Sequence, residues 1–292
     1  MGKVGEIMQQ IFGWVRWRGA SLAALLLTAA CRPEVAGSSP RQAPTASTKG
    51  PSVESVPRPS GEFAWPKGAR AAVSLTYDDG MESQLVPAAA HLEKAGLYAT
   101  FFVNEIKDDA PWRALRQQGH ELGGHTLHHP CPRSFEVPTT PSEDLDLVKM
   151  GLELDGDVAQ LERLGQASPF SFAYPCGITW VGAQQSYVDL VRERFFAARL
   201  AADEGSQGAT DPYMVPAKFG LLTLSDLAGA VQRAAQDGRW LVLGFHGIGS
   251  GWLITDTQVH EQFVMELAAR KDVWVAPFGT VAQYKATKIS GK

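Results

Sequence analysis

Residues 71–80 read AAVSLTYDDG, an apolar and β-rich run that ends in two carboxylates and a glycine. Such a run predicts a buried strand over residues 71–76. Asp78 and Asp79 would then lie at the C-terminal end of that strand, where α/β proteins of both open-sheet and barrel type place their active sites. Taken alone, an Asp-Asp-Gly sequence after a strand is more often a simple turn than a site.

Further apolar runs alternate with segments of helical period along the chain. The predicted strands span 71–76, 98–103, 170–174, 195–200, 240–245 and 273–277. The predicted helices span 82–95, 111–118, 143–164, 184–193, 224–237 and 257–270. This alternation predicts an α/β fold in which helices cover a parallel sheet, either a doubly wound layer or a closed barrel. The folded part, 62–292, has the length of one such domain.

Histidines are concentrated in one short segment, since four of the seven lie between residues 120 and 129. His125 and His129 would share one face if this stretch is locally helical. Two imidazoles and one carboxylate leave a coordination position for water, as in catalytic zinc sites. His246 follows a late apolar run, where it could donate the proton that a leaving group needs in metal-assisted hydrolysis. We interpret His120 and His128 as surface or supporting residues.

These segments, in this order, resemble the motifs of NodB-type polysaccharide deacetylases, carbohydrate esterase family 4. The first family motif, Thr-(Phe/Tyr)-Asp-Asp-Gly, matches residues 76–80, and the second, His-(Ser/Thr)-x-x-His-Pro, matches 125–130. A histidine after a late apolar strand matches His246. The resemblance runs over residues 64–284 and implies a distorted (β/α) barrel, the NodB homology domain, with its site at the C-terminal mouth.

The resemblance also implies a role for each matching residue. The implied catalytic groups and ligands are Asp78 as general base, His246 as general acid, and Asp79, His125 and His129 as ligands of a divalent metal. The backbone N–H of Cys176, in the third motif FAYPCG, would stabilise the oxyanion. The implied substrate pocket contains Tyr77, Tyr174, Pro175 and Leu243. Zinc is the expected metal, and cobalt, nickel or iron would also suit these ligands.

The chain departs from the family pattern around both catalytic groups. The third motif commonly opens with an arginine that holds the base aspartate, and Ala173 stands in that place. We find no Asp-x-x-Trp fourth motif, so the group that orients the general acid is to be sought among Asp203, Glu204 and Asp211.

A third departure concerns the pocket for the acetyl methyl group. Gly244 stands where relatives often place a leucine that walls this pocket. The neighbouring Leu243 is a candidate substitute.

The N-terminal part of the chain has the features of an export signal followed by a tether. Basic residues precede an apolar run over 20–30, which at about a dozen residues is too short to span a bilayer as a helix. We therefore expect residues 1–30 to be a signal peptide. Cys31 follows a sequence that resembles a bacterial lipobox, so we expect lipidation there; the alternative is simple cleavage near Ala30. Residues 31–61, rich in proline and serine, are expected to form a disordered linker.

Export has consequences for location and for the remaining cysteines. The expected location is the cell envelope, as a periplasmic or outer-surface lipoprotein held at the membrane by its lipid; the alternative is secretion. With Cys31 lipidated, Cys131 and Cys176 remain as an even pair in an oxidising compartment, so we predict that they form a disulfide. The alternative is two buried thiols.

The charge distribution excludes one class of partner. The formal net charge is -4, and the basic residues after the leader are scattered among acids without the stripe that phosphate contacts require. We therefore expect no nucleic-acid binding. The sequence leaves the oligomeric state open.

The sequence as a whole predicts a metal-dependent hydrolase that removes acetyl groups from an N-acetylated polysaccharide of the cell envelope or extracellular space. Two alternatives from the same superfamily are an amidohydrolase of small cyclic or linear amides and an esterase that removes O-acetyl groups from xylan. A third alternative is a carbohydrate-binding lipoprotein that has kept the fold without turnover.

Overall fold

The computed structural model describes residues 63–201 and 211–290. The predicted signal peptide, lipidation site and linker lie outside these residues, as do Asp203 and Glu204. Within the described ranges, no helix combines the length and apolar character needed to cross a membrane.

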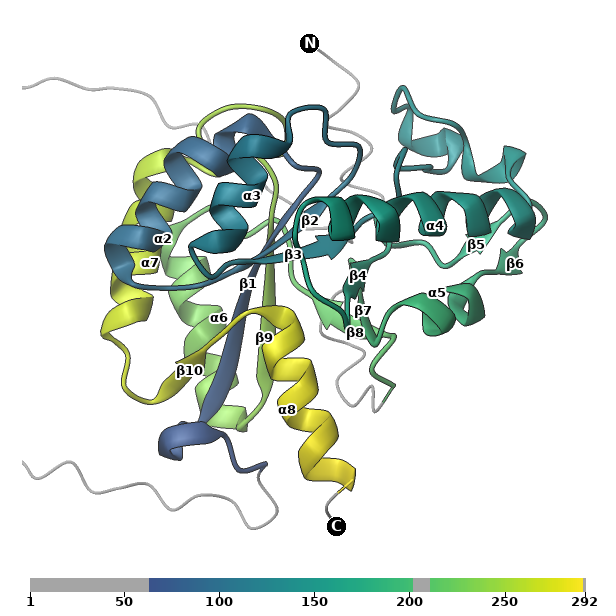
Figure 1. The fold of residues 1–292 in the computed structure, drawn as a ribbon. Helices are drawn as coiled ribbons and strands as arrows, with labels where there is room; N and C mark the ends of the chain where they lie inside the picture. Colours follow the sequence, from purple (N-terminus) through teal and green to yellow (C-terminus); the bar gives the residue numbers. More distant parts are fainter. Residues whose placement is uncertain (1–62, 202–210, 291–292) are drawn as a thin grey trace, which may run out of the picture. The chain divides into compact units, whose positions relative to one another are not determined.

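Eight parallel strands form the sheet of the described domain (Figure 1). They are β1 (Ala71–Asp78), β2 (Thr100–Val103), β3 (Glu121–Gly124), β4 (Ser171–Ala173), β7 (Ala197–Ala201), β8 (Val215–Ala217), β9 (Trp240–Phe245) and β10 (Val273–Val275). The order along the sheet is β10-β1-β2-β3-β4-β7-β8, and β9 pairs with β1. A bridge between Lys218 and Leu243 joins the end of β8 to β9 and nearly closes the ring. The predicted distorted barrel is confirmed, and the doubly wound alternative is wrong.

Helices follow most of the strands and cover the outside of the barrel (Figure 1). They are the π-helical turn η2 (Gln84–Ala88), α2 (Ala89–Ala95), α3 (Asp109–Gln117), α4 (Leu147–Arg163), α5 (Val188–Arg194), α6 (Leu224–Asp237), α7 (Thr257–Ala269) and α8 (Phe278–Ser290). Short 3-10 turns are η1 (Pro66–Gly68), η3 (Arg133–Phe135), η4 (Ser142–Asp144) and η5 (Pro175–Gly177), and β5 (Trp180–Val181) pairs with β6 (Gln185–Ser186) as a small antiparallel hairpin. The helices α2 and α6 both pack against α7.

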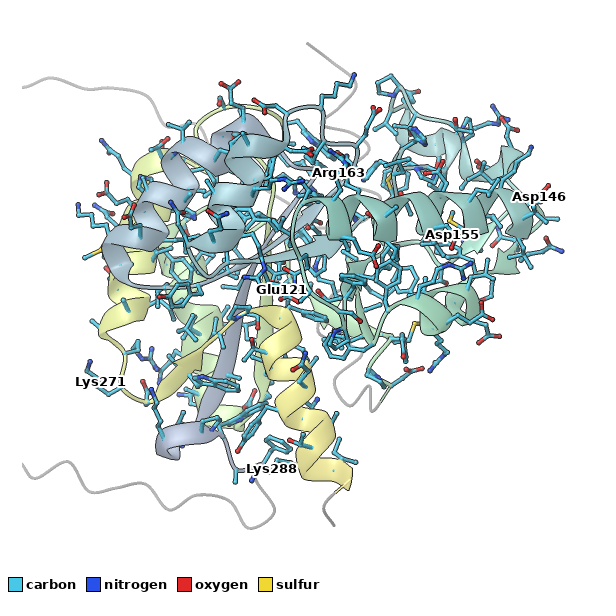
Figure 2. All side chains as sticks on the ribbon, viewed as in Figure 1. Glu121, Asp146, Asp155, Arg163, Lys271 and Lys288 are labelled. Carbon is cyan, nitrogen blue, oxygen red and sulfur yellow. A yellow bond between two sulfur atoms is a disulfide. The ribbon has the colours of Figure 1, made fainter. Side chains whose placement is uncertain are left out.

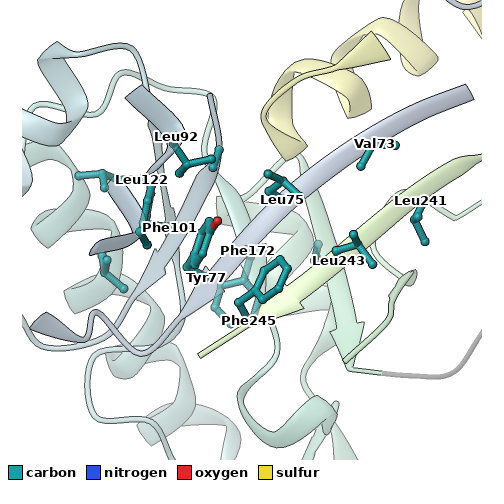
Figure 3. Packing of buried hydrophobic residues seen from close by; sticks show 14 of the residues in the cluster. Val73, Leu75, Tyr77, Leu92, Phe101, Leu122, Phe172, Leu241, Leu243 and Phe245 are labelled. Atoms are coloured by element: carbon teal, nitrogen blue, oxygen red, sulfur yellow. The ribbon is translucent and has the colours of Figure 1, made fainter. Parts of the chain in front are cut away.

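Strand β1 is the centre of the core, because all eight of its residues are buried. Its outward side chains, Val73, Leu75 and Tyr77, belong to the main hydrophobic cluster beneath the helices (Figure 3). The alternate residues point into the barrel. Among them, Thr76 donates a hydrogen bond from Oγ1 to the carbonyl oxygen of Leu243, 2.9 Å away. This alternation places Asp78 inside the barrel, at its C-terminal end.

The N-terminal end of the barrel is closed by the start of α8. The backbone N–H of Phe278 donates to Thr100 Oγ1 over 2.7 Å, and that of Gly279 donates to Glu121 Oε2 over 2.9 Å. Glu121 lies beside the first turn of α8 (Figure 2) and also accepts a hydrogen bond from Ser171. Thr100, Glu121 and Ser171 are the first residues of their strands, so α8 covers the end of the barrel opposite Asp78.

Strands β3 and β8 and helix α8 were not predicted from the sequence. Strand β3 reads ELGG, which has little strand propensity. Its glycines are required by packing, because a Cβ on Gly123 would lie 2.5 Å from the ring of Phe102 and one on Gly124 would lie 2.3 Å from Asp157 Oδ2. Strand β8 contains a proline, which argues against a strand when read locally.

Candidate active site

The predicted site residues come together on turns at the C-terminal ends of four strands, β1, β3, β4 and β9. Several of these turns have left-handed backbone, with φ of 77° at Asp79, 58° at Thr126, 52° at His129 and 53° at Cys176. Such conformations are costly for residues other than glycine and cluster at functional sites. The expectation that His125 and His129 share a helical face is therefore wrong, because a tight left-handed turn brings the two rings together.

Three side chains converge as the sequence predicts for metal ligands. His125 Nε2 lies 3.4 Å from Asp79 Oδ1, and His129 Nε2 lies 3.2 Å from the same oxygen. The potential ligand atoms of all three residues lie within 4.8 Å of one another. Both carboxylate oxygens of Asp79 are buried and accept no hydrogen bond from the described residues. A buried carboxylate without donors, facing two imidazoles, fits a divalent cation.

The far nitrogens of both rings are held by other groups. His125 Nδ1 donates a hydrogen bond to the carbonyl oxygen of Ala173 over 2.8 Å, which leaves Nε2 directed at the carboxylate. His129 Nδ1 lies 3.5 Å from Cys131 Sγ. In each ring the nitrogen nearest Asp79 is therefore Nε2, the orientation that metal coordination requires.

The electrostatics of this cluster also suit a cation. Burial lowers the pKa of His129 to about 4, so its ring is neutral near pH 7. Burial would lower the pKa of His125 as well, but its interaction with Asp79 and the charge of Asp78 raise it. Burial would raise the pKa of Asp79, but the neighbouring imidazoles lower it below its usual range. The carboxylate is therefore ionised, which suits a divalent cation.

Asp78 and His246 lie beside these three residues. Asp78 Oδ2 is 4.0 Å from His125 Nε2, and His246 Nε2 is 3.9 Å from Asp79 Oδ2. Burial lowers the pKa of His246, although the two aspartates oppose this, and the protonated ring is then a stronger acid. The geometry can therefore place a proton acceptor and a proton donor around one reacting centre.

Gln84 connects the two catalytic candidates and was not found from the sequence. Its Nε2 donates to the carbonyl oxygen of Asp78 and, over 3.2 Å, to that of His246. The nearby Ser83 Oγ accepts from the backbone N–H of Ile248 over 3.2 Å. These bonds join the ends of β1 and β9, and no local sequence signal marks them, because both residues lie at the start of a predicted helix.

Comparison with known proteins agrees with this geometry. The family model described as polysaccharide deacetylase matches residues 66–190, which include the first two motifs and the third. This match supports a NodB-type polysaccharide deacetylase domain that includes residues 66–190. A structure from Mycobacterium smegmatis, described as a polysaccharide deacetylase, superimposes with a TM-score of 0.59 at 17% identity, covering 79% of this chain and 95% of that one.

Two further relatives show the breadth of this likeness. Puue allantoinase shares the fold of the deacetylase domain with a TM-score of 0.54 at 14% identity, covering 79% of this chain and 93% of that one. A gellan lyase from Bacillus sp is 28% identical over 150 residues, which are 51% of this chain but only 5% of that protein. The structural likenesses show the fold, and the lyase match shows a related segment within a far longer chain.

Three of the four predicted pocket residues lie in the hydrophobic core and not at the site. Tyr77 is fully buried and stacks between Phe101 and Phe245, with ring centroids 4.8 and 5.4 Å away (Figure 3). Leu243 lies in the same hydrophobic cluster, as does Tyr174. The pocket prediction is wrong for these residues because their side chains point outward beneath the helices. Pro175 does lie in the turn after β4.

Phe219 takes the place expected for a leucine at Gly244. A Cβ on Gly244 would lie 2.1 Å from the ring of Phe219, so only glycine accommodates this ring. The ring centroid of Phe219 is 5.3 Å from that of His246. The apolar wall beside the general-acid candidate thus comes from Phe219, two residues after β8, and Leu243 does not supply it.

The candidate base Asp78 is paired with Arg199, which the sequence analysis did not single out. Arg199 lies on β7, is fully buried, and donates a hydrogen bond from Nη2 to Asp78 Oδ1. The available signal was an arginine inside the predicted apolar strand 195–200.

Aromatic rings, and not the predicted carboxylates, contact His246 in the described residues. Asp211 is directed elsewhere, because it accepts hydrogen bonds from Arg192 and from the backbone N–H of Tyr213. The ring of Trp252 lies 4.7 Å from that of His246, measured between centroids. Asp211 is therefore excluded as the orienting group, and the rings of Trp252 and Phe219 pack beside the imidazole.

The predicted disulfide is present in the structure. Cys131 and Cys176 are bonded, with their Cα atoms 5.8 Å apart. The bond links the turn that carries His129 to the turn whose backbone N–H is the predicted oxyanion donor.

We expect native mature protein to show no free thiol at these two positions. Alkylation under native conditions should leave Cys131 and Cys176 unmodified, and alkylation after reduction should label both, as read by peptide mass spectrometry. Equal labelling with and without reductant would show that the thiols are free in the protein.

Proposed function

We propose that this domain is a metal-dependent deacetylase that removes acetyl groups from an N-acetylated polysaccharide of the cell envelope or extracellular space. The observation that carries the proposal is the convergence of Asp79, His125 and His129 on one point, with Asp78 and His246 on its flanks. Zinc is the proposed metal, since two imidazoles and a carboxylate suit it.

The roles of the protein groups follow from their positions. A divalent metal held by the three ligands would polarise the acetyl carbonyl and acidify the attacking water. Asp78 accepts the proton of that water, because its Oδ2 faces the site while Oδ1 is held by Arg199. The backbone N–H of Cys176 donates to the oxyanion. His246 protonates the departing amine through Nε2, and acetate leaves.

An exposed aromatic ring beside His246 supports a sugar substrate. Trp252 is 42% exposed and lies in a tight loop after β9, where the backbone N–H of Gly247 donates to the carbonyl oxygen of Trp252 over 3.1 Å. The N–H of Thr255 in turn donates to the carbonyl oxygen of Gly247 over 2.9 Å. A pyranose ring can pack its C–H face on such an indole, which favours a saccharide over a small amide.

We expect the change Trp252→Ala to raise KM for an acetylated oligosaccharide by about 5-fold, as loss of about 1 kcal/mol of stacking would do. KM for a small acetyl ester should change much less, and Trp252→Phe should lie between wild type and alanine. Tyr98→Ala, which removes an exposed ring near the other end of the barrel, is the matched control. An unchanged oligosaccharide KM in Trp252→Ala would exclude the stacking role.

The proposed location is the cell envelope, reached through the predicted signal peptide and held by lipid on Cys31. The features that support it are the apolar leader and the proline-rich segment that follows it. The disulfide is consistent with an oxidising compartment.

The decisive test is acetate release by metal-loaded mature protein from a panel of substrates. The panel contains chitooligosaccharides, peptidoglycan, poly-N-acetylglucosamine and acetylxylan, and hydrolysis of allantoin, which carries no acetyl group, is followed separately by loss of the substrate. Release from an N-acetylated polymer supports the proposal. Turnover confined to acetylxylan or allantoin would assign the esterase or the amidohydrolase, and no turnover with metal bound would favour a binding protein.

A further inference from the structure

We propose that Arg199 is the positioning residue for the base Asp78, and that this chain supplies it from the strand next to the one that carries the third motif. The inference rests on the proposed function, because it assigns Arg199 a part in the same reaction. Its first support is the register of the sheet. Ala173 on β4 and Arg199 on β7 are direct partners in the parallel pairing of these strands.

Partners in register project their side chains from the same face of a sheet. Both Ala173 and Phe102 belong to the cluster inside the barrel, and the guanidinium of Arg199 lies over the ring of Phe102. The methyl group of Ala173 therefore leaves the space into which the longer side chain of Arg199 extends. Arg199 on β7 thus fills the space that an arginine at position 173 on β4 would fill.

The guanidinium is held on both faces by aromatic rings. Its central carbon lies 4.7 Å from the ring centroid of Phe102 and 5.0 Å from that of Phe219. This sandwich aims Nη2 at Asp78 Oδ1. Oδ2 then remains on the side of His125, 4.0 Å from its Nε2. One oxygen of the base is thus fixed and the other faces the reacting centre.

The environment of Arg199 favours a functional role over a purely stabilising one. The side chain is fully buried, and its Nε and Nη1 have no hydrogen-bond partner among the described residues. A buried guanidinium with unpartnered donors costs folding free energy, and a buried ion pair is in general weak evidence for stability. The partner that Arg199 does hold is the catalytic candidate.

A second small residue that leaves space for a large side chain lies on the other side of the site. Gly244 on β9 leaves space for Phe219, which follows β8, and Phe219 packs on both Arg199 and His246. The Phe219 ring therefore joins the residue that positions the base to the residue proposed as the acid.

The test removes the arginine from position 199 and, in a second variant, places an arginine at position 173 instead. Arg199→Met keeps an unbranched chain between the two rings, and we expect it to lower kcat for acetate release by about 10²-fold with little change in KM. The double variant Arg199→Ala with Ala173→Arg should recover most of the lost kcat, which a merely structural arginine would not do. Arg192→Met, a surface arginine on α5, is the control and should keep wild-type kcat.

A second measurement separates this inference from the proposed function. A urea-unfolding cycle of wild type, Asp78→Asn, Arg199→Met and the double variant reports the coupling of the pair without any substrate. We expect non-additive midpoint shifts together with the loss of kcat. The inference would be overturned by additive midpoint shifts or by wild-type kcat in Arg199→Met. It would also be overturned if the variant Arg199→Ala with Ala173→Arg folds but recovers no kcat. Coupling in a wild type that releases no acetate would refute the function and leave the pair a structural one.

Discussion

The double change His125→Ala with His129→Ala is expected to abolish stoichiometric binding of divalent metal and to reduce acetate release to background. The two rings place Nε2 within 3.4 and 3.2 Å of Asp79 Oδ1, and their removal leaves a single carboxylate. One carboxylate cannot hold a transition metal against water and buffer ligands. Metal content of the purified protein, measured by inductively coupled plasma mass spectrometry, checks the result.

His128→Ala is the matched control for this experiment. His128 lies between the two ligands in the sequence, but its side chain is 55% exposed and its Nδ1 is 2.8 Å from Glu153 Oε1. The control variant should keep full metal content and activity. Unchanged metal content in the double variant would refute the ligand assignment, and loss of metal in the control would show that the loop had been disturbed.

The change Asp78→Asn is expected to retain metal and to lower kcat for acetate release by about 10²–10⁴-fold, the range typical of a lost general base. Asparagine keeps an oxygen that can accept the hydrogen bond of Arg199, so the site should stay folded. It cannot take a proton from water. The measurement is steady-state kinetics on the best substrate of the panel, with metal content determined on the same sample.

Asp155→Asn gives the control for the loss of one carboxylate. Asp155 pairs with Arg194 on the surface, away from the barrel interior (Figure 2), so its amide should leave kcat unchanged. Wild-type kcat in Asp78→Asn would show that another group is the base. Loss of both metal and activity would instead assign Asp78 to metal binding.

The fold was predictable because its signal is local. Strands buried on both faces read as unbroken apolar runs, and β1 and β9 were recognised in this way. Strand β3 was missed because packing against Phe102 and Asp157, and not strand propensity, selects its glycines. A residue chosen by a distant neighbour carries no local signature.

The metal ligands of the candidate site could be predicted from the sequence, but most of its pocket residues could not. The family resemblance implies that Asp79, His125 and His129 are ligands of one metal, and the structure brings the three together. The pocket prediction is wrong because residues next to the motifs in the sequence need not lie next to them at the site. Tyr77 directly precedes the catalytic pair, yet it faces the opposite side of the strand.

The amino-acid sequence alone predicts the α/β alternation, the order of the carboxylates and histidines at strand ends, and the pair of cysteines available for a disulfide. The contact of Arg199 with Asp78 and the packing of Phe219 over Gly244 became visible only in the folded protein. These contacts depend on the register between neighbouring strands. In a parallel barrel that register is set by packing between segments far apart in the chain, so no local pattern records it.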